Sequence, residues 1–466
     1  MRIHDPLSEE LVLVRGLLPS LVAAMERTVP YAAAWVSRMQ GLQIIVSDRE
    51  QHIAEVLPSQ GAVFTAWNGE FLEEAATSDL SRGILEKTAL DLAKCITFRH
   101  GADGIDPGDA LTQEYVTRVK MWPSDLSPQE RLEFCIDLHA RTRRLDPRII
   151  NVQVRYTDGA IATVFANRAK LLSQFVQRVR LLVLVMVSDG EKMRYDYLSR
   201  DGTGGMELLE VSDDDLRRLC DTAVALLSAE RIEPGFYNVI CTPDVSGVMA
   251  HEAFGHGVEM DMFLKDRAKS REFLGKRIAP PHVNILDDPS YPGGFGSYFF
   301  DDEGQLASPT YIIRDGIFER GLTDLYSAHV LGFPRSANGR RESFARKVYA
   351  RMSNTFFGRG TTPVSEMVAS MERGIYLKHV SSGMEDPKGW GVQLTCHYGE
   401  EIANGKPTGR LFHPIGVTGY VPDVLNSISM VGNDFALDGG NCGKGHKEWV
   451  PVSSGGPHLK MKVRLG

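Results

Sequence analysis

The sequence has few of the features that mark secreted, membrane-spanning or nucleic-acid-binding proteins. Its six cysteines are spread over 466 residues and form no C-x-x-C pair, which excludes a disulfide framework and favours a reducing compartment. The longest purely apolar run, residues 181–187, is too short to cross a bilayer. The net charge of -8 gives no general attraction to nucleic acid or to an anionic membrane. We therefore expect a cytoplasmic protein that has neither nucleic acid nor membrane as a partner.

Length and composition predict more than one domain. A chain of 466 residues can bury sizeable cores, and 43% hydrophobic with 24% charged residues is ordinary for a globular protein. Helical and strand-like segments alternate up to about residue 230, whereas glycine and turn residues become frequent beyond residue 261. We predict an α+β fold with an N-terminal α/β domain (1–230) and a β-rich C-terminal domain (231–466).

The N-terminal half contains a pattern that is typical of a β-hairpin. Residues 149–156 alternate between apolar and polar side chains, Thr157, Asp158 and Gly159 are turn residues, and residues 161–167 are predicted to form the returning strand. A helix start is predicted at Ser127, which can act as the cap, followed by Pro128 at the first helical position. These patterns predict antiparallel strands and capped helices in this half.

The segment richest in reactive side chains is residues 251–261, which read H-E-A-F-G-H-G-V-E-M-D. A helix is predicted to lead into it, because Thr242 can cap a helix and Pro243 suits its first position. Four apolar residues then recur at helical spacing and should face a core: Val245, Val248, Met249 and Ala253. Histidines beside carboxylates indicate a metal site, although such histidines are also found merely hydrogen-bonded or solvated.

The spacing of His251 and His256 constrains the backbone between them. The zinc-peptidase pattern H-E-x-x-H places two imidazoles one helical turn apart. Positions five apart on an α-helix are instead rotated by roughly 140°, so a regular helix could not aim both rings at one ion. We expect the extra residue to form a π-bulge, made easier by the flexible backbone of Gly255 and Gly257.

A catalytic zinc site generally has three protein ligands and one open position, so a third ligand is needed. The candidates are Glu259, Asp261, His282, His413, His446, His458 and a cysteine. Cys442 stands out because residues 438–445 (D-G-G-N-C-G-K-G) surround it with glycine, and Lys444 would favour the metal-binding thiolate. A loop cysteine without a metal would share this setting. Glu259 could bind metal or orient an imidazole, and Glu252 is the natural general base.

The motif resembles that of the TldD/PmbA family, the modulator-of-gyrase type metallopeptidases. The resemblance extends over the C-terminal half, through D-D-P-S-Y-P-G-G-F-G-S-Y-F-F-D-D-E-G (287–304), R-M-S-N-T (351–355), V-G-N-D-F (431–435) and G-G-N-C-G-K-G (439–445). It implies Zn²⁺ held by His251, His256 and Cys442, with Glu252 as catalytic acid/base. It also implies peptide substrates and a homodimer, or a heterodimer with a metal-free paralogue. Residues 443–446 (G-K-G-H) depart from the G-K-D-G-Q that the family often has there.

The sequence therefore predicts a zinc-dependent peptidase that acts on small or unfolded peptides. The rival is a non-catalytic peptide-binding or assembly protein with a structural zinc site. A fourth protein ligand such as Glu259 would close the site and favour that rival, whereas three ligands leave a position for water. An oxidoreductase that uses iron is a third possibility, but no nucleotide-binding fingerprint supports it.

Overall fold

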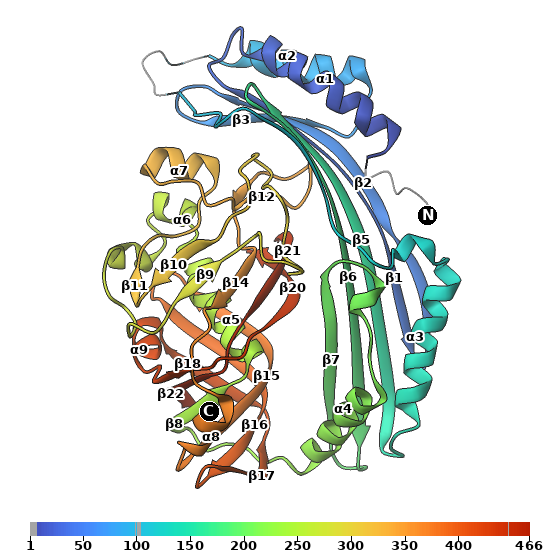
Figure 1. Cartoon of the computed structure of the whole chain (residues 1–466), viewed down its shortest axis with the longest axis vertical. Helices are drawn as coiled ribbons and strands as arrows, with labels where there is room; N and C mark the ends of the chain where they lie inside the picture. The colour runs from blue at the N-terminus through green and yellow to red at the C-terminus, as the bar shows by residue number, and fades with distance from the viewer. Residues whose placement is uncertain (1–6, 98, 100–103, 446) are drawn as a thin grey trace.

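A computed structural model describes residues 7–97, 99, 104–445 and 447–466. It is a mixed α+β structure, as predicted, with a long curved sheet facing a β-rich body (Figure 1). The curved sheet uses strands that precede residue 204, and the other sheets use strands that follow residue 234. The predicted domain boundary at residues 230–231 stays a prediction.

The curved sheet has seven strands in the order β3-β2-β1-β5-β6-β4, with β7 also paired to β6. Strand β4 pairs with the first part of β6 in parallel, and β7 pairs with the rest of β6 in antiparallel fashion. The strands are β1 (Ala32–Ser47), β2 (Gln51–Trp67), β3 (Leu72–Thr77), β4 (Leu111–Val116), β5 (Ile149–Asn167), β6 (Lys170–Ser188) and β7 (Met193–Thr203).

The predicted hairpin at residues 149–167 is wrong, because β5 runs through its supposed turn as one continuous strand. Asp158 is buried, and its carboxylate accepts hydrogen bonds from Arg131 at 2.6 Å and from the Tyr156 hydroxyl at 2.7 Å. Gly41 of β1 pairs with the neighbouring Gly159, and a side chain on Gly41 would overlap the Asp158 carbonyl. Residues 157–159 have the composition of a turn, but a buried polar side chain that is hydrogen-bonded can lie inside a strand.

Four helices pack on the curved sheet in two groups (Figure 1). The helices are α1 (Glu9–Met25), α2 (Arg82–Cys95), α3 (Pro128–Arg143) and α4 (Asp213–Ala225). The first two share a core with β1 and β2, and the other two share a core with β5 and β6. The predicted start of α3 is confirmed, because Ser127 and Glu130 form a capping box around Pro128.

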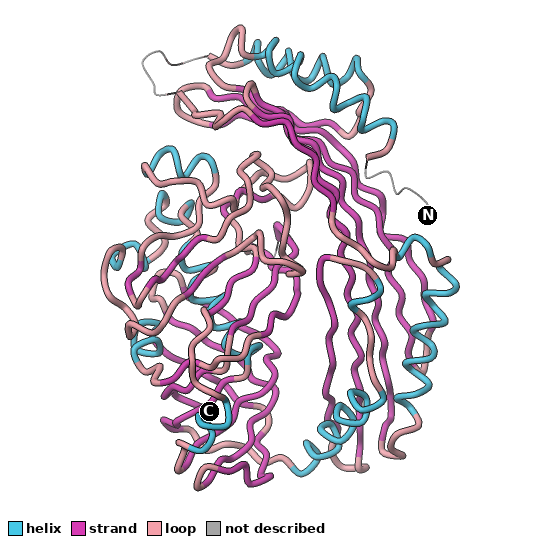
Figure 2. The backbone as a smooth tube through the Cα atoms, viewed as in Figure 1, coloured by secondary structure: helices cyan, strands magenta, loops and turns pink. Residues whose placement is uncertain are grey.

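The C-terminal half is dominated by strands, as the magenta segments in Figure 2 show. One of its sheets closes on itself, since β15, β8, β22, β18 and β16 pair in turn and β16 pairs back to β15. β17 and β19 extend this closed sheet. Its strands are β8 (Gly235–Cys241), β15 (Arg373–Asp386), β16 (Gly391–Ala403), β17 (Lys406–Phe412), β18 (Ile415–Tyr420), β19 (Met430–Val431) and β22 (Leu459–Leu465).

A six-stranded sheet in the order β11-β10-β9-β14-β21-β20 completes the C-terminal half, together with a short pair formed by β12 and β13. These strands are β9 (Ile285–Asp287), β10 (Thr310–Arg314), β11 (Ile317–Phe318), β12 (Gly339–Arg340), β13 (Tyr349–Ala350), β14 (Asn354–Phe357), β20 (Ala436–Lys444) and β21 (Lys447–Gly456). The helices are α5 (Pro243–Phe254), α6 (Asp261–Leu264), α7 (Leu325–Leu331), α8 (Val364–Ala369) and α9 (Val421–Asn426). Helix α5 packs against β14 and β21 of one sheet and β15 of the other, so the motif lies between them.

Among the described residues, none of the helices is both long and apolar enough to span a membrane.

We predict that glycine at position 247 is required for α5 to pack closely against β21. It lies inside the helix, and a Cβ there would overlap the backbone of Ser454 and Gly455 in β21. Gly247→Ala should therefore lower the free energy of unfolding by about 1–3 kcal/mol, as overpacking does. Gly16→Ala is the matched control, because Gly16 lies inside α1, where an added Cβ would have no other atom within 4 Å.

The control substitution should raise the free energy of unfolding by about 0.5–1 kcal/mol, since alanine favours a helix over glycine. Denaturant unfolding of both variants measures the difference. Equal effects of the two substitutions would contradict the close approach of α5 and β21.

Candidate metal centre

Helix α5 brings the motif to the middle of the C-terminal half. Thr242 occupies the cap and Pro243 the first helical position, as predicted, although the Thr242 side chain does not cap the helix. Three of the four predicted core residues are buried: Val245, Met249 and Ala253. Val248 is only partly buried, because it also lines a cleft described below. His251 lies in the last turn of the helix and is 8% exposed.

The backbone between the two motif histidines is not a continuous α-helix, as the spacing argument required. The predicted π-bulge is wrong, however. Helix α5 ends at Phe254, Gly255 adopts φ -95° and ψ -82°, and a 3-10 turn starts at His256. A side chain on Gly255 would overlap the Met352 sulfur and the His251 carbonyl, so glycine is needed at the break. A helix end followed by a tighter turn solves the rotation problem that a π-bulge would have solved.

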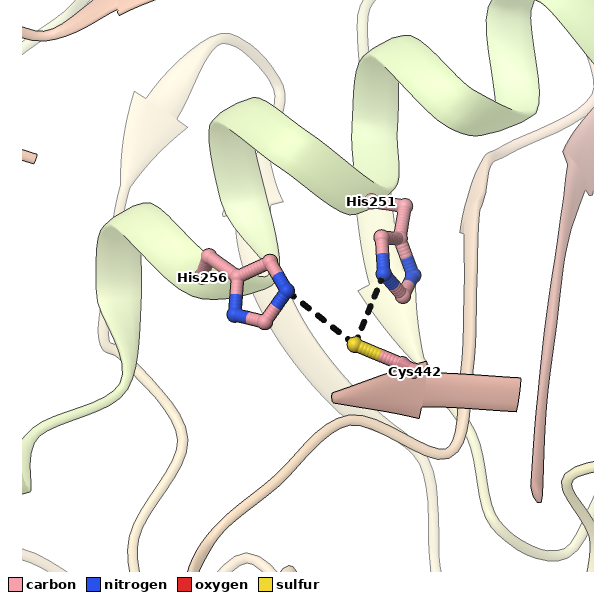
Figure 3. Close-up of side chains that lie close together, drawn as sticks. All are labelled: His251, His256 and Cys442. Carbon is pink, nitrogen blue, oxygen red and sulfur yellow. Dashed lines mark hydrogen bonds between the residues drawn. The ribbon is translucent and has the colours of Figure 1, made fainter. Parts of the chain in front are cut away.

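The turn brings His251, His256 and Cys442 together (Figure 3). Cys442 Sγ lies 3.2 Å from His251 Nε2 and 3.0 Å from His256 Nε2, and the two rings are nearly perpendicular at 88°. One ligand atom from each residue lies within 4.8 Å of the others. Zinc bonded tetrahedrally to sulfur and nitrogen holds such atoms about 3.5 Å apart. The donor types and spacing therefore fit a zinc ion after small side-chain movements.

Cys442 comes from β20, at the edge of the six-stranded sheet, and is 5% exposed. Burial alone would raise the pKa of its thiol, but the neighbouring imidazoles of His251 and His256 lower it to about 5. The thiolate is the form that binds a metal. The described surroundings thus favour the ionised sulfur at neutral pH.

Glu259 lies behind His256 rather than beside the sulfur. Its carboxylate is 3.5 Å from His256 Nδ1, 3.0 Å from the Lys444 ammonium and 3.2 Å from Arg351 Nε. Burial would raise the pKa of this carboxyl, but Lys444, His256 and Arg351 hold it well below its usual range. Glu259 can therefore orient the His256 ring as a charged acceptor. His251 differs, because its Nδ1 has no hydrogen-bond partner among the described residues.

A cleft of about 730 Å³ reaches His251 from the side of the curved sheet. His251, Glu252 and Val248 line it from α5, and the glycine-rich residues 439–441 of β20 line it from the edge of the six-stranded sheet. β7 and α4 form the opposite wall. Glu252 lies close to Gly383 of β15, where an added Cβ would be 2.8 Å from its carboxylate. Glu252 is therefore the motif carboxylate that a molecule in the cleft would meet.

The other candidate ligands lie elsewhere. His282 is exposed in a turn, His413 contacts the carbonyl of His397, and His458 bridges Asp434 and Tyr376. Asp261 accepts a hydrogen bond from Lys444 at 2.8 Å and is not part of the three-residue group. His446 lies outside the described residues.

The sequence analysis missed Arg351, which is fully buried and donates to the Cys442 sulfur at 3.1 Å. Its only signal in the sequence was its position at the start of R-M-S-N-T. The rest of that motif supports the scaffold. Ser353 and Thr355 donate hydrogen bonds to the buried carboxylate of Asp287, the first residue of the D-D-P-S-Y motif. The two motifs thus hold β14 against β9.

Comparisons with known proteins relate this chain to metallopeptidases. Residues 234–464 match the model of the PmbA/TldA metallopeptidase C-terminal domain. The chain is 30% identical over 449 residues to a protein of Methanothermobacter thermautotrophicus named "Metalloprotease". The aligned region covers 96% of this chain and 97% of that protein. It is 33% identical over 229 residues to the "Zinc metalloprotease TldD homolog" of Saccharolobus solfataricus. This alignment covers 49% of this chain and 51% of that protein.

Solved structures share the whole fold at low sequence identity. A modulator of a DNA gyrase from Thermotoga maritima superposes with a TM-score of 0.78 at 17% identity, covering 98% of this chain and 100% of the other. TldE from Thermococcus kodakarensis superposes with a TM-score of 0.72 at 14% identity, covering 96% of this chain and 99% of that one. The extent of the match to the Methanothermobacter protein and the C-terminal family model lead to one conclusion: this chain belongs to the TldD/PmbA family.

Proposed function

We propose that this protein is a zinc-dependent peptidase in which His251, His256 and Cys442 bind zinc and Glu252 is the general base. The observation that carries the proposal is the convergence of two imidazoles and one buried thiol beside a cleft that His251 and Glu252 line. The names of the relatives support a metallopeptidase, and one of those names specifies zinc.

Bound zinc would lower the pKa of water towards ~7 and polarise a carbonyl group. The protein's own contribution would come from Glu252, which lines the cleft next to His251. Its carboxylate can take a proton from the attacking water and return it to the leaving amine. Neighbouring residues on a helix point about 100° apart, which suits Glu252 to proton transfer beside the metal rather than to binding it.

The structural-zinc rival requires a fourth protein ligand. Glu259 is the nearest candidate, but its oxygens face Arg351, Lys444 and the Nδ1 side of His256. Among the described residues the group suited to a metal contains only the two histidines and the cysteine. This arrangement supports a site with an open position on the cleft side, and therefore catalysis.

The cleft also suits an extended peptide. β20 is an edge strand, and the partly buried Gly440 of this strand lines the cleft. A peptide paired with such an edge is recognised through its main chain, which agrees with small or unfolded peptides as substrates. The cytoplasmic location and the pairing as a homodimer or with a metal-free paralogue remain predictions.

Cys442→Ala should reduce bound zinc from about one ion per chain to almost none, because one of three ligands is lost. The fold should survive, since the Arg351 guanidinium keeps the backbone carbonyl of residue 442 and the Glu259 carboxylate as acceptors. Elemental analysis and thermal unfolding measure the two effects. Cys135→Ala, which removes another buried thiol, should keep its zinc. Full zinc occupancy in Cys442→Ala would move the third ligand to Glu259.

Glu252→Gln should retain zinc and bind peptide but hydrolyse it roughly 100-fold more slowly or worse, because the amide cannot accept the proton. Peptide cleavage and metal content are measured together, with the natural dimer partner supplied if one is required. Glu272→Gln, the same change at an exposed position, is the control and should match wild type. Cleavage at the wild-type rate would remove Glu252 from the mechanism, and loss of zinc would make it a ligand.

A further inference from the structure

Arg351 has an acceptor for every nitrogen of its guanidinium group, although it is fully buried. Nε donates to Glu259 Oε1 at 3.2 Å, Nη1 donates to the carbonyl of Glu448, and Nη2 donates to the carbonyl of Cys442 at 3.0 Å. Nη2 also lies 3.1 Å from the Cys442 sulfur. A buried guanidinium is costly unless it is fully paired, so these contacts hold it in one orientation.

This one side chain supports two of the three proposed ligands, one by direct contact and one through a carboxylate. It reaches Cys442 directly, and it reaches His256 through the Glu259 carboxylate, whose second oxygen lies 3.5 Å from His256 Nδ1. Lys444 supports the same carboxylate from the other side at 3.0 Å. His251 has no such support among the described residues. Within the described part of the chain, buried charged side chains therefore support Cys442 and His256 but not His251.

We propose that Arg351 is a positioning residue that fixes Cys442 and His256 relative to each other and weakens electron donation from the sulfur to the metal. The inference rests on the proposed metal site. Its basis is geometric: an N–H group that donates to a thiolate takes part of the electron density the sulfur would otherwise give to a bound cation. The bound cation would consequently remain a stronger Lewis acid than an unsupported thiolate would allow.

This role requires the planar guanidinium group of arginine, which holds several N–H donors in fixed directions. Lysine carries the same charge but presents it as a single point, so it could not contact Glu259, the Cys442 carbonyl and the Cys442 sulfur in fixed directions. Arg351→Lys therefore keeps the charge and removes the geometry. Arg340→Lys is the matched control, because Arg340 is also buried but contacts the Met352 carbonyl and the Tyr298 ring instead of a proposed ligand.

The experiment uses the full-length chain, stripped of metal and loaded with Co²⁺, whose bond to a thiolate gives a sulfur-to-metal charge-transfer band in the near ultraviolet. We expect the band of Arg351→Lys to shift to longer wavelength than in wild type, because the sulfur donates more strongly. We expect its zinc affinity to fall by about 10- to 100-fold, as for other residues that orient metal ligands. Arg340→Lys should change neither.

Glu259→Gln separates the two contacts of Arg351. It weakens the support of His256 but leaves the contact with Cys442, so zinc affinity should fall while the band stays in place. An unshifted band in folded Arg351→Lys would overturn the inference and leave the proposed function intact. Failure of both Arg351→Lys and Arg351→Gln to fold, while Arg340→Lys folds, would assign Arg351 to stability alone and also overturn it. Absence of a thiolate band in wild type would instead refute the proposed metal site.

Discussion

The contact between one buried sulfur and two imidazoles is the interaction on which the candidate metal site depends, and it constrains how the C-terminal half is packed. Cys442 comes from an edge strand and His251 and His256 from α5 and the turn after it, so the contact requires the helix to lie close against the six-stranded sheet. That closeness requires Gly247 where α5 meets β21. It also requires the helix to end at Gly255, because a further α-helical turn would rotate His256 away.

The site was more predictable from sequence than its scaffold. The spacing of the motif histidines ruled out a regular helix, and local cap and core signals placed the start of α5 correctly. The sequence did not specify how the backbone accommodates the one residue by which this motif exceeds H-E-x-x-H. A π-bulge and a helix end followed by a 3-10 turn satisfy the same rotation. The folded structure shows that the helix ends at Gly255, where the Met352 side chain leaves no room for a side chain.

The elements that sequence patterns missed are those stabilised by distant partners. Residues 157–159 have turn propensity, yet they continue β5 because Arg131, far away on α3, pairs with Asp158. Arg351 precedes Cys442 by 91 residues, and no periodicity or local spacing connects them. The family resemblance grouped Cys442 with the histidines, but a buried cation beside a thiolate becomes visible only when the chain is folded.

The charges around the site explain why such a cation is present. Glu259, Asp261 and the Cys442 thiolate form a buried group of three negative charges, and Arg351 and Lys444 contribute two positive charges in contact with them. The excess of one negative charge among these five groups favours binding of a dication, and with zinc bound the same five groups would carry one net positive charge. Without the two buried cations, the three negative charges would exceed the double positive charge of zinc and leave little attraction for a developing oxyanion. The basic residues, although they repel the metal, would therefore preserve its ability to polarise a substrate.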